Sequence, residues 1–192
     1  MEFFTDFADQ AVVLPLTAAI AATLALLGWQ RGALAWLVAI GGTFGLMLLL
    51  KLLFLACGQL VPEVHVRTPS GHTASAAIIV GGLIALSGLG SEKRVAVAIA
   101  SAVLAAILFG FSRLSLGKHT LSEVVIGGLV GSAGAVLLVW LAGRPPDRLR
   151  TDRLAAVVLA VVILFHGFHL PAEAQIYRTA SLLRVWPLSV CR

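Results

Sequence analysis

Two short polar clusters interrupt an otherwise apolar chain, and each contains a histidine. The first is the tetrapeptide Pro-Ser-Gly-His at residues 69–72, and the second holds Ser112, Arg113, His119 and Glu123. An ionisable side chain at membrane depth is costly and therefore indicates a function. We expect the histidines, arginines and carboxylate of the two clusters to converge on one anion-binding site.

The first cluster has the composition of a helix start that can hold an anion. Thr68 suits the N-cap position and Pro69 the first helical position, which leaves the amides of the first turn free to bind an anion. Gly71 has no Cβ to keep an oxyanion away from the backbone. Ser70 can donate a hydrogen bond, and His72 can exchange a proton near neutral pH. The alternative is a routine helix start with a histidine at the membrane interface.

The second cluster places a carboxylate four residues after a histidine. If a helix begins near His119, Glu123 lies one turn further along the same face. The carboxylate can then accept the Nδ1 proton of His119 and leave Nε2 free to act as a nucleophile. The alternative is that Thr120 and Glu123 form a capping box that serves only the helix terminus, although both roles can coexist.

Both clusters resemble the signature of the type 2 phosphatidic acid phosphatase superfamily, the lipid phosphate phosphatases, whose fold is shared with vanadium haloperoxidases. That signature has a Lys, six residues and Arg-Pro; then Pro-Ser-Gly-His; then Ser-Arg, five residues, His, three residues and Asp. Residues 69–72 match the second motif in full. Ser112, Arg113 and His119 match the third motif at the family spacing, with Glu123 where Asp is usual.

The first motif is incomplete. Lys51 stands where its lysine is expected, but Gly58 and Gln59 follow where the family has Arg-Pro. Arg67, two residues before Pro69, is the candidate for the missing guanidinium, supplied from the other end of a short loop. The alternative for Lys51 is a snorkelling side chain at a helix end.

The resemblance implies a role for each matched residue. His119 attacks phosphorus and becomes a transient phosphohistidine, Glu123 orients it, and His72 protonates the leaving group. The equatorial oxygens of the phosphoryl group are held by Lys51, Arg67, Ser70, the Gly71 amide and Arg113. Such chemistry depends mainly on positioning and positive charge. With Glu63 and Glu123 as the only nearby acids, we expect no metal, no cofactor and activity that persists in chelator.

Apolar helices must position these residues. The 192-residue chain is 59% hydrophobic and 12% charged, with a mean hydropathy of +1.00, so most of it belongs in a bilayer, where the backbone must be helical. We predict an all-α membrane bundle of six transmembrane helices with a haloperoxidase-like phosphatase core, forming one domain over residues 1–192. The predicted transmembrane segments are about 11–28, 33–57, 73–90, 95–111, 121–142 and 154–170. Residues 171–192 form either an interfacial helix or a disordered tail.

The basic residues indicate topology rather than nucleic-acid binding. The formal net charge is +5, but no basic run is interleaved with aromatics, so we expect no nucleic-acid partner. Lys and Arg favour cytoplasmic loops, and one set of alternate loops carries Arg31, Lys93, Arg94, Arg144, Arg148, Arg150 and Arg153. The opposite side holds both clusters and an acidic N-terminus, although Arg178, Arg184 and Arg192 also fall there. We therefore predict an integral inner (plasma) membrane protein whose active site faces the periplasm or the exterior.

Four further residues fall on the same predicted side as the two clusters. His166 and His169 could line a headgroup pocket or bind a metal, although such residues are commonly only interfacial. Cys57 and Cys191 could form a disulfide on an oxidising side of the membrane or remain free thiols.

The predicted function is metal-independent hydrolysis of a phosphate monoester or pyrophosphate of a lipid through a phosphohistidine. One alternative keeps the intermediate but passes the phosphoryl group to another lipid or a sugar. A second alternative, motivated by the incomplete first motif, is a non-catalytic membrane protein that binds or moves phospholipids. Release of inorganic phosphate without an acceptor, and its dependence on His119, would separate the three.

Overall fold

The described part of the chain is helical. The computed structural model describes residues 6–57, 66–88, 93–146 and 149–185, and these ranges contain no strand. Within them the order is η1 (Asp6–Ala8), α2 (Gln10–Leu26), α3 (Gln30–Cys57), α4 (Gly71–Leu86), α5 (Arg94–Ser115), α6 (Leu121–Ala142), α7 (Thr151–Phe165) and α8 (Ala172–Val185). The predicted all-α class is confirmed for these residues. Each predicted apolar segment coincides with one helix, and the tail begins with a helix.

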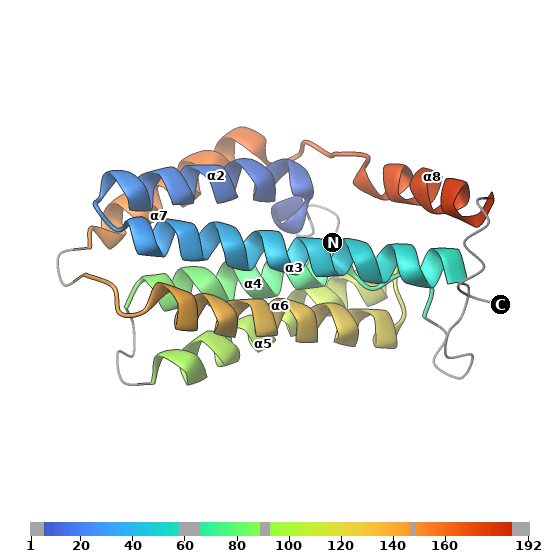
Figure 1. The fold of residues 1–192 in the computed structure, drawn as a ribbon, viewed down its shortest axis with the longest axis horizontal. Helices are drawn as coiled ribbons and strands as arrows, with labels where there is room; N and C mark the ends of the chain where they lie inside the picture. The colour runs from blue at the N-terminus through green and yellow to red at the C-terminus, as the bar shows by residue number, and fades with distance from the viewer. Residues whose placement is uncertain (1–5, 58–65, 89–92, 147–148, 186–192) are drawn as a thin grey trace.

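Helix α4 lies at the centre of the bundle. It packs against α3, α5 and α6, and α6 also packs against both α3 and α5. Helices α2 and α7 form a pair on one flank, where α2 contacts α3, while α8 lies beside the C-terminal part of α3 (Figure 1). The second motif therefore enters the centre of the bundle at the start of α4, and the third motif joins α5 to α6.

The largest hydrophobic core among the described residues lies between α2, α3, α4, α6 and α7. Its bulkiest buried side chains include Trp36, Ile20, Leu24, Ile78 and Leu138. The indole Nε1 of Trp36 donates a hydrogen bond to the carbonyl oxygen of Thr17 at 3.1 Å, so this buried N–H is satisfied and ties α3 to α2.

Glycines of α6 bring this helix into close contact with α4. A Cβ at Gly127 would collide with the carbonyl oxygen of Ser70, and one at Gly131 would collide with that of Ala74. Small residues at a helix interface allow two backbones to approach closely, which is a common packing mode in membranes. Because Gly127 lies one turn after Glu123, this close approach also holds the two motif clusters together.

Within the part of the chain that the structure describes, three helices are long and apolar enough to cross a membrane, namely α3, α5 and α6, whereas the apolar helices α2 and α4 are shorter. Membrane association is therefore supported, but the predicted count of six crossings is not confirmed by helix length. It stays a prediction, because short apolar helices can span where the bilayer thins locally.

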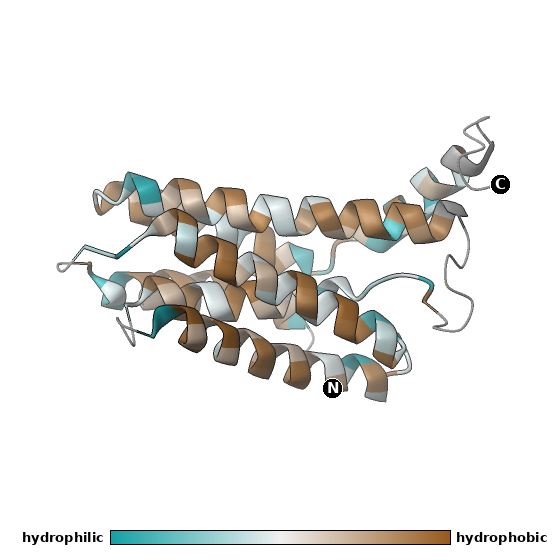
Figure 2. Cartoon of the chain, turned by 60° about the horizontal axis from the view of Figure 1, so that its bottom comes forward, coloured by the Kyte–Doolittle hydropathy of each residue, from teal (hydrophilic) through white to brown (hydrophobic). Residues whose placement is uncertain are grey.

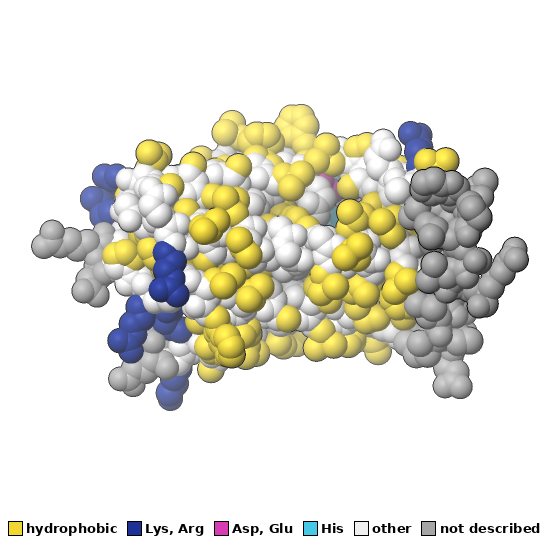
Figure 3. Space-filling model, viewed as in Figure 1, with side chains coloured by type: hydrophobic (Ala, Val, Ile, Leu, Met, Phe, Trp, Pro, Cys, Tyr) yellow, Lys and Arg dark blue, Asp and Glu magenta, His cyan; other side chains and the backbone are white. Residues whose placement is uncertain are grey.

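The outer surface of the bundle suits contact with lipid. Large apolar side chains are exposed on α3, α5 and α6, including Leu34, Leu49, Leu104, Ile107 and Leu129. The hydropathy colouring shows apolar residues along the lengths of the helices and more hydrophilic ones toward their ends (Figure 2). In Figure 3 hydrophobic side chains cover the middle of the molecule, and most visible Lys and Arg side chains gather at the end where α3 begins.

Candidate active site

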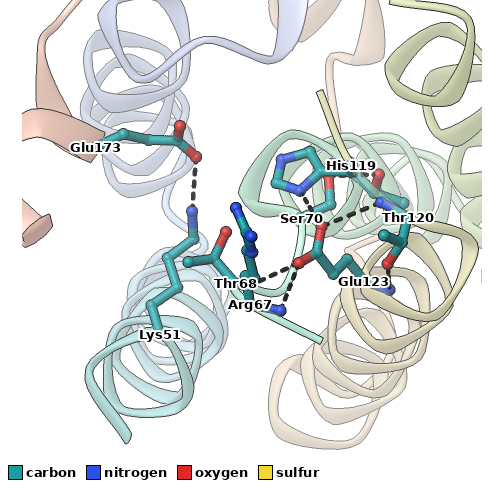
Figure 4. A network of polar contacts seen from close by, with 9 residues as sticks. Lys51, Arg67, Thr68, Ser70, His119, Thr120, Glu123 and Glu173 are labelled. Carbon is teal, nitrogen blue, oxygen red and sulfur yellow. Dashed lines mark hydrogen bonds and ion pairs between the residues drawn. The ribbon is translucent and has the colours of Figure 1, made fainter. Parts of the chain in front are cut away.

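His119 is held by Glu123 immediately before α6. The Nδ1 atom of His119 lies 2.9 Å from Oε2 of Glu123. The same oxygen accepts the backbone N–H of Thr120 at 3.1 Å, and the Thr120 hydroxyl accepts the N–H of Glu123 at 3.4 Å, which completes a capping box. Both roles considered for Glu123 therefore coexist, as Figure 4 shows.

The second nitrogen of His119 has no partner among the described residues. Its side chain is 3% exposed, and Nε2 is buried without a hydrogen bond in this part of the chain. Burial lowers the pKa of the His119 imidazole from its ordinary value of 6.5, and the hydrogen bond with Glu123 opposes part of that shift. A neutral imidazole with Nδ1–H donated to the carboxylate carries its lone pair on Nε2, as a nucleophile requires.

The other carboxylate oxygen of Glu123 anchors the segment that precedes α4. Oε1 accepts the backbone N–H of Arg67 at 2.7 Å and that of Thr68 at 2.8 Å. The carbonyl oxygen of Glu123 also accepts the N–H of Ser70 at 3.0 Å. Glu123 thus joins the second motif to the third, and one side chain fixes both the histidine and the neighbouring loop.

The predicted start of α4 was wrong by two residues. Ser70, rather than Thr68, is the N-cap, and Gly71, rather than Pro69, is the first helical residue. The reason is local hydrogen bonding, because the Ser70 hydroxyl accepts the N–H of Thr73 at 3.4 Å and its hydroxyl at 2.9 Å. The N–H of Thr68 is already used by Glu123. The Ser70 side chain is fully buried in this arrangement, so its hydroxyl proton is the group left to donate.

A pocket of about 650 Å³ lies between α2, α3, α4 and the α7–α8 connection, and Lys118, the residue before His119, is part of its lining although His119 itself is not. Its cationic and titratable lining includes Lys51, His72, Arg113 and Lys118, together with Gly71. A Cβ at Gly71 would lie 3.8 Å from the Lys51 ammonium, so the start of α4 lies next to that cation. Lys51 is buried and does not reach into solvent, which favours its place in the site over snorkelling.

Two further polar atoms at the third motif are buried without a partner among the described residues. They are Nε of Arg113 and Oγ of Ser112. A buried donor left unpaired costs free energy, and such groups commonly await a ligand. With Nε2 of His119 they are three unsatisfied groups contributed by one sequence motif.

Three acidic residues of the pocket were missed by sequence analysis. Glu173 lies with its Oε1 2.8 Å from the Lys51 ammonium, Asp9 lies 3.8 Å from His72, and Asp6 lies 2.9 Å from His169. The expectation that Glu63 and Glu123 are the only nearby acids was therefore wrong. Each missed acid lies far along the chain from its partner, so no local spacing reveals it. Within the described ranges, no three His, Cys, Asp or Glu side chains form a metal-binding group.

These contacts affect the ionisation of Glu173 and His169. Burial alone would raise the pKa of the Glu173 carboxyl. The Lys51 ammonium and the nearby histidines together outweigh burial, so the pKa is lowered and the group stays ionised. The hydrogen bond that His169 donates to the Asp6 carboxylate raises the pKa of this exposed histidine. His169 therefore lines the pocket as one half of an ion pair rather than as a metal ligand.

The remaining candidates have different outcomes. In the view of Figure 4, Arg67 lies between Lys51 on one side and the His119–Glu123 pair on the other. The side chain of Arg67 is exposed. That Arg67 takes the place of the arginine missing from the first motif stays a prediction. The His166 ring packs against Phe7 with ring centroids 4.5 Å apart. Glu63, His65, Cys191 and the side chain of Cys57 lie outside the described residues.

The fold and site together define a helical membrane protein with a carboxylate-bound histidine beside buried cations. The family model of the PAP2 superfamily matches residues 32–145, more than half of the chain, and the chain belongs to this superfamily, whose members are phosphatases. The predicted membership is confirmed.

One relative has been described in Klebsiella pneumoniae. The chain is 33% identical over 195 residues to an "Uncharacterized 22.5 kDa protein in cps region", with 94% of this chain and 90% of the relative covered. No solved structure matches. The family match contains all three motifs but not Asp6, Asp9, His169 or Glu173, so the acidic part of the pocket lies outside it.

Proposed function

We propose that this chain is a membrane lipid phosphatase that hydrolyses a phosphate monoester or pyrophosphate through a phosphohistidine on His119. The observation that carries the proposal is the state of His119, whose Nδ1 is held by Glu123 while Nε2 is buried and unpaired in the described structure. A histidine kept only for packing would be expected to satisfy both ring nitrogens. Lys51 acts electrostatically on His119, and both Lys51 and Arg113 line the pocket, where they would supply positive charge for a phosphoryl group.

The pocket supports a lipid as the substrate because its lining divides into two parts. The cationic part contains Lys51, Arg113 and Lys118, and a second part is formed by apolar side chains, namely Leu14, Phe44, Met47 and Leu48. Leu14 and Leu48 are also exposed on the outer surface of the bundle. A phosphate ester with an acyl or prenyl chain fits such a division, because its headgroup and chain need opposite environments.

The first half of the reaction forms the intermediate. Nε2 of His119 attacks phosphorus, the N–P bond forms, and the bond from phosphorus to the leaving oxygen breaks. His72 gives its proton to that oxygen, so the lipid alcohol or phosphate leaves in protonated form. The Nδ1 proton stays on His119 and is donated to the Glu123 carboxylate, which stabilises the positive charge of the phosphorylated ring.

The second half regenerates the enzyme. Neutral His72 accepts a proton from water as that water attacks phosphorus. The N–P bond breaks, inorganic phosphate leaves, and His119 returns to its neutral state with the lone pair on Nε2. Each step needs only the residues named and water, so we expect turnover to continue in EDTA.

The test is phosphate release by purified protein from a panel of lipid phosphates. We expect His119→Ala to reduce turnover by at least about 10³-fold, because removal of a nucleophile eliminates the covalent route. His166→Ala is the matched control, since His166 lies near the same end of the molecule but packs against Phe7. Unchanged phosphate release in His119→Ala would refute the proposal and favour a non-catalytic, lipid-binding protein.

Two further measurements refine the same experiment. Phosphate release without an added acceptor distinguishes hydrolysis from transfer to a second lipid or sugar. Arg67→Ala in parallel tests whether this side chain holds phosphate, in which case KM should rise more than kcat falls.

A further inference from the structure

We infer that Asp9 is a positioning residue for His72, holding the imidazole and favouring its protonated form when it acts on the leaving group. This inference rests on the proposed function. Asp9 lies outside the family match and outside all three motifs. Its place in the pocket comes from the fold, which brings the start of α2 beside the start of α4.

The two oxygens of Asp9 have different partners. Oδ1 accepts the backbone N–H of Ala11 at 2.8 Å, as the N-cap of α2, and that of Leu170 at 3.3 Å. Oδ2 faces Nε2 of His72 at 3.8 Å. Because two backbone bonds from separate segments fix Oδ1, the carboxylate cannot turn away, and its second oxygen stays directed at the histidine.

The charges around His72 explain why this oxygen matters. Burial, and then the Arg113 guanidinium and His119, disfavour the imidazolium and lower the pKa of His72 from 6.5 to about 4. Asp9 and Glu173 act in the opposite direction, and Asp9 is the stronger of the two. Glu173 is also engaged by Lys51 at 2.8 Å. Asp9 is therefore the main fixed charge that favours a proton on His72.

The proton path keeps Asp9 out of the bond-making steps. His72 passes its Nε2 proton to the leaving oxygen as that oxygen separates from phosphorus, and it recovers a proton from the attacking water. Asp9 takes up no proton and remains a carboxylate throughout. The 3.8 Å separation and the place of both residues on the pocket wall leave Nε2 accessible from the pocket.

The competing explanation is that Asp9 serves only as a helix cap, and Asp9→Asn separates the two roles. Asn is as good an N-cap as Asp and retains an oxygen that can accept both backbone bonds, but it removes the charge. The matched control is Asp6→Asn, which removes the same charge from the same pocket next to His169 instead of His72.

The measurement is kcat/KM against pH for two substrates, an alkyl phosphate with a poor leaving group and p-nitrophenyl phosphate with a good one. Departure of an alkoxide depends strongly on a proton donor, whereas departure of p-nitrophenolate depends on it little. For Asp9→Asn we expect about a tenfold loss on the alkyl phosphate, little loss on the aryl phosphate, and an alkaline limb about one pH unit lower for the alkyl phosphate.

Other outcomes would overturn the inference. Equal losses on both substrates would indicate a purely structural role, as would a fall in thermal stability without a change in the pH profile. The same profile in Asp6→Asn would show a general charge effect. Failure of the proposed function is a different result, because the wild-type protein would then release no phosphate, or His119→Ala would release as much.

Discussion

At the scale of single residues, Glu123 is the centre of the site. Its Oε2 contacts His119 and its Oε1 accepts two amides of the segment before α4. The family motif usually has Asp at this position, and the additional methylene of Glu explains how one side chain reaches both groups. The longer side chain thus contacts His119 through one oxygen and the segment before α4 through the other.

Shortening this side chain should break one of its two connections. We expect Glu123→Asp to lose about 10- to 100-fold in kcat, because a carboxylate that orients a catalytic group tolerates displacement poorly. Glu123→Gln should lose at least as much, because its NH₂ group cannot accept the bonds made by one of the two oxygens. Turnover and thermal unfolding check this, with Ser122→Ala from the same helical turn as control. Wild-type kcat in Glu123→Asp would contradict it.

The pH dependence of the reaction should reflect the ionisation of His119. Burial lowers the pKa of this imidazole below 6.5, and protonation would remove its nucleophilic lone pair. Activity should therefore persist as the pH falls through 6.5 and decline only below it. The measurement is kcat/KM against pH with p-nitrophenyl phosphate, and an acid limb centred above pH 6.5 would contradict the expectation.

Residues within the motifs could be predicted from the sequence, whereas their distant partners could not. His119 and Glu123 lie four residues apart, so helical geometry alone predicts their contact. Asp9 and Glu173 reach His72 and Lys51 only through the packing of separate helices. The start of α4 was mispredicted because two nearby residues could serve as N-cap, and Ser70 rather than Thr68 accepts the bonds from Thr73.

At the scale of elements, the contact between α4 and α6 positions the groups that we propose to be catalytic. Gly127→Ala should destabilise the protein by about 1 to 3 kcal/mol and reduce kcat, because its methyl group would collide with the carbonyl oxygen of Ser70. Gly45→Ala is the matched control, since a Cβ there has no atom within 4 Å among the described residues. Thermal unfolding in detergent measures the difference, and equal stability of the two variants would contradict this account.

Helix α8 brings a carboxylate to the lysine that we expect to bind phosphate. Glu173 must leave Lys51 when a phosphate oxygen takes its place, so the two anions compete. A partly exposed ion pair contributes about 1 kcal/mol or less, which corresponds to at most about a fivefold change in affinity. We expect Glu173→Gln to lower the inhibition constant of inorganic phosphate or vanadate by up to this factor.

Thr179→Ala, on an exposed part of α8, is the control for that experiment. An inhibition constant that rises in Glu173→Gln would show that Glu173 supports anion binding instead of opposing it. Hydropathy predicted helices α2 to α7 well, because each contains an apolar run. It could not predict the contact between α8 and α3, because Glu173 and Lys51 are far apart in the chain.

At the scale of the whole molecule, most basic side chains and the candidate active site lie at different ends. Most visible Lys and Arg side chains gather where α3 begins, whereas the ion pair between Lys51 and Glu173 lies near the C-terminal end of that helix (Figures 1 and 3). Positive charge favours the cytoplasmic side, so we expect the site to face outward.

Labelling of introduced cysteines tests this orientation. In a chain with Cys57 and Cys191 replaced, Tyr177→Cys should react with a membrane-impermeant maleimide in sealed cells, because it is exposed on α8. Asp152→Cys, exposed at the start of α7, should react only after permeabilisation. The reverse pattern would place the site in the cytoplasm.

The apolar wall of the pocket, which includes residues exposed on the outer face of the bundle, changes what substrate concentration means for this protein. A lipid that enters along such a wall arrives by diffusion within a film two molecules thick, not from the bulk solution. Its encounter rate then follows the mole fraction of that lipid among its neighbours. Adding inert detergent or carrier lipid at a fixed amount of substrate should therefore slow the reaction by dilution alone.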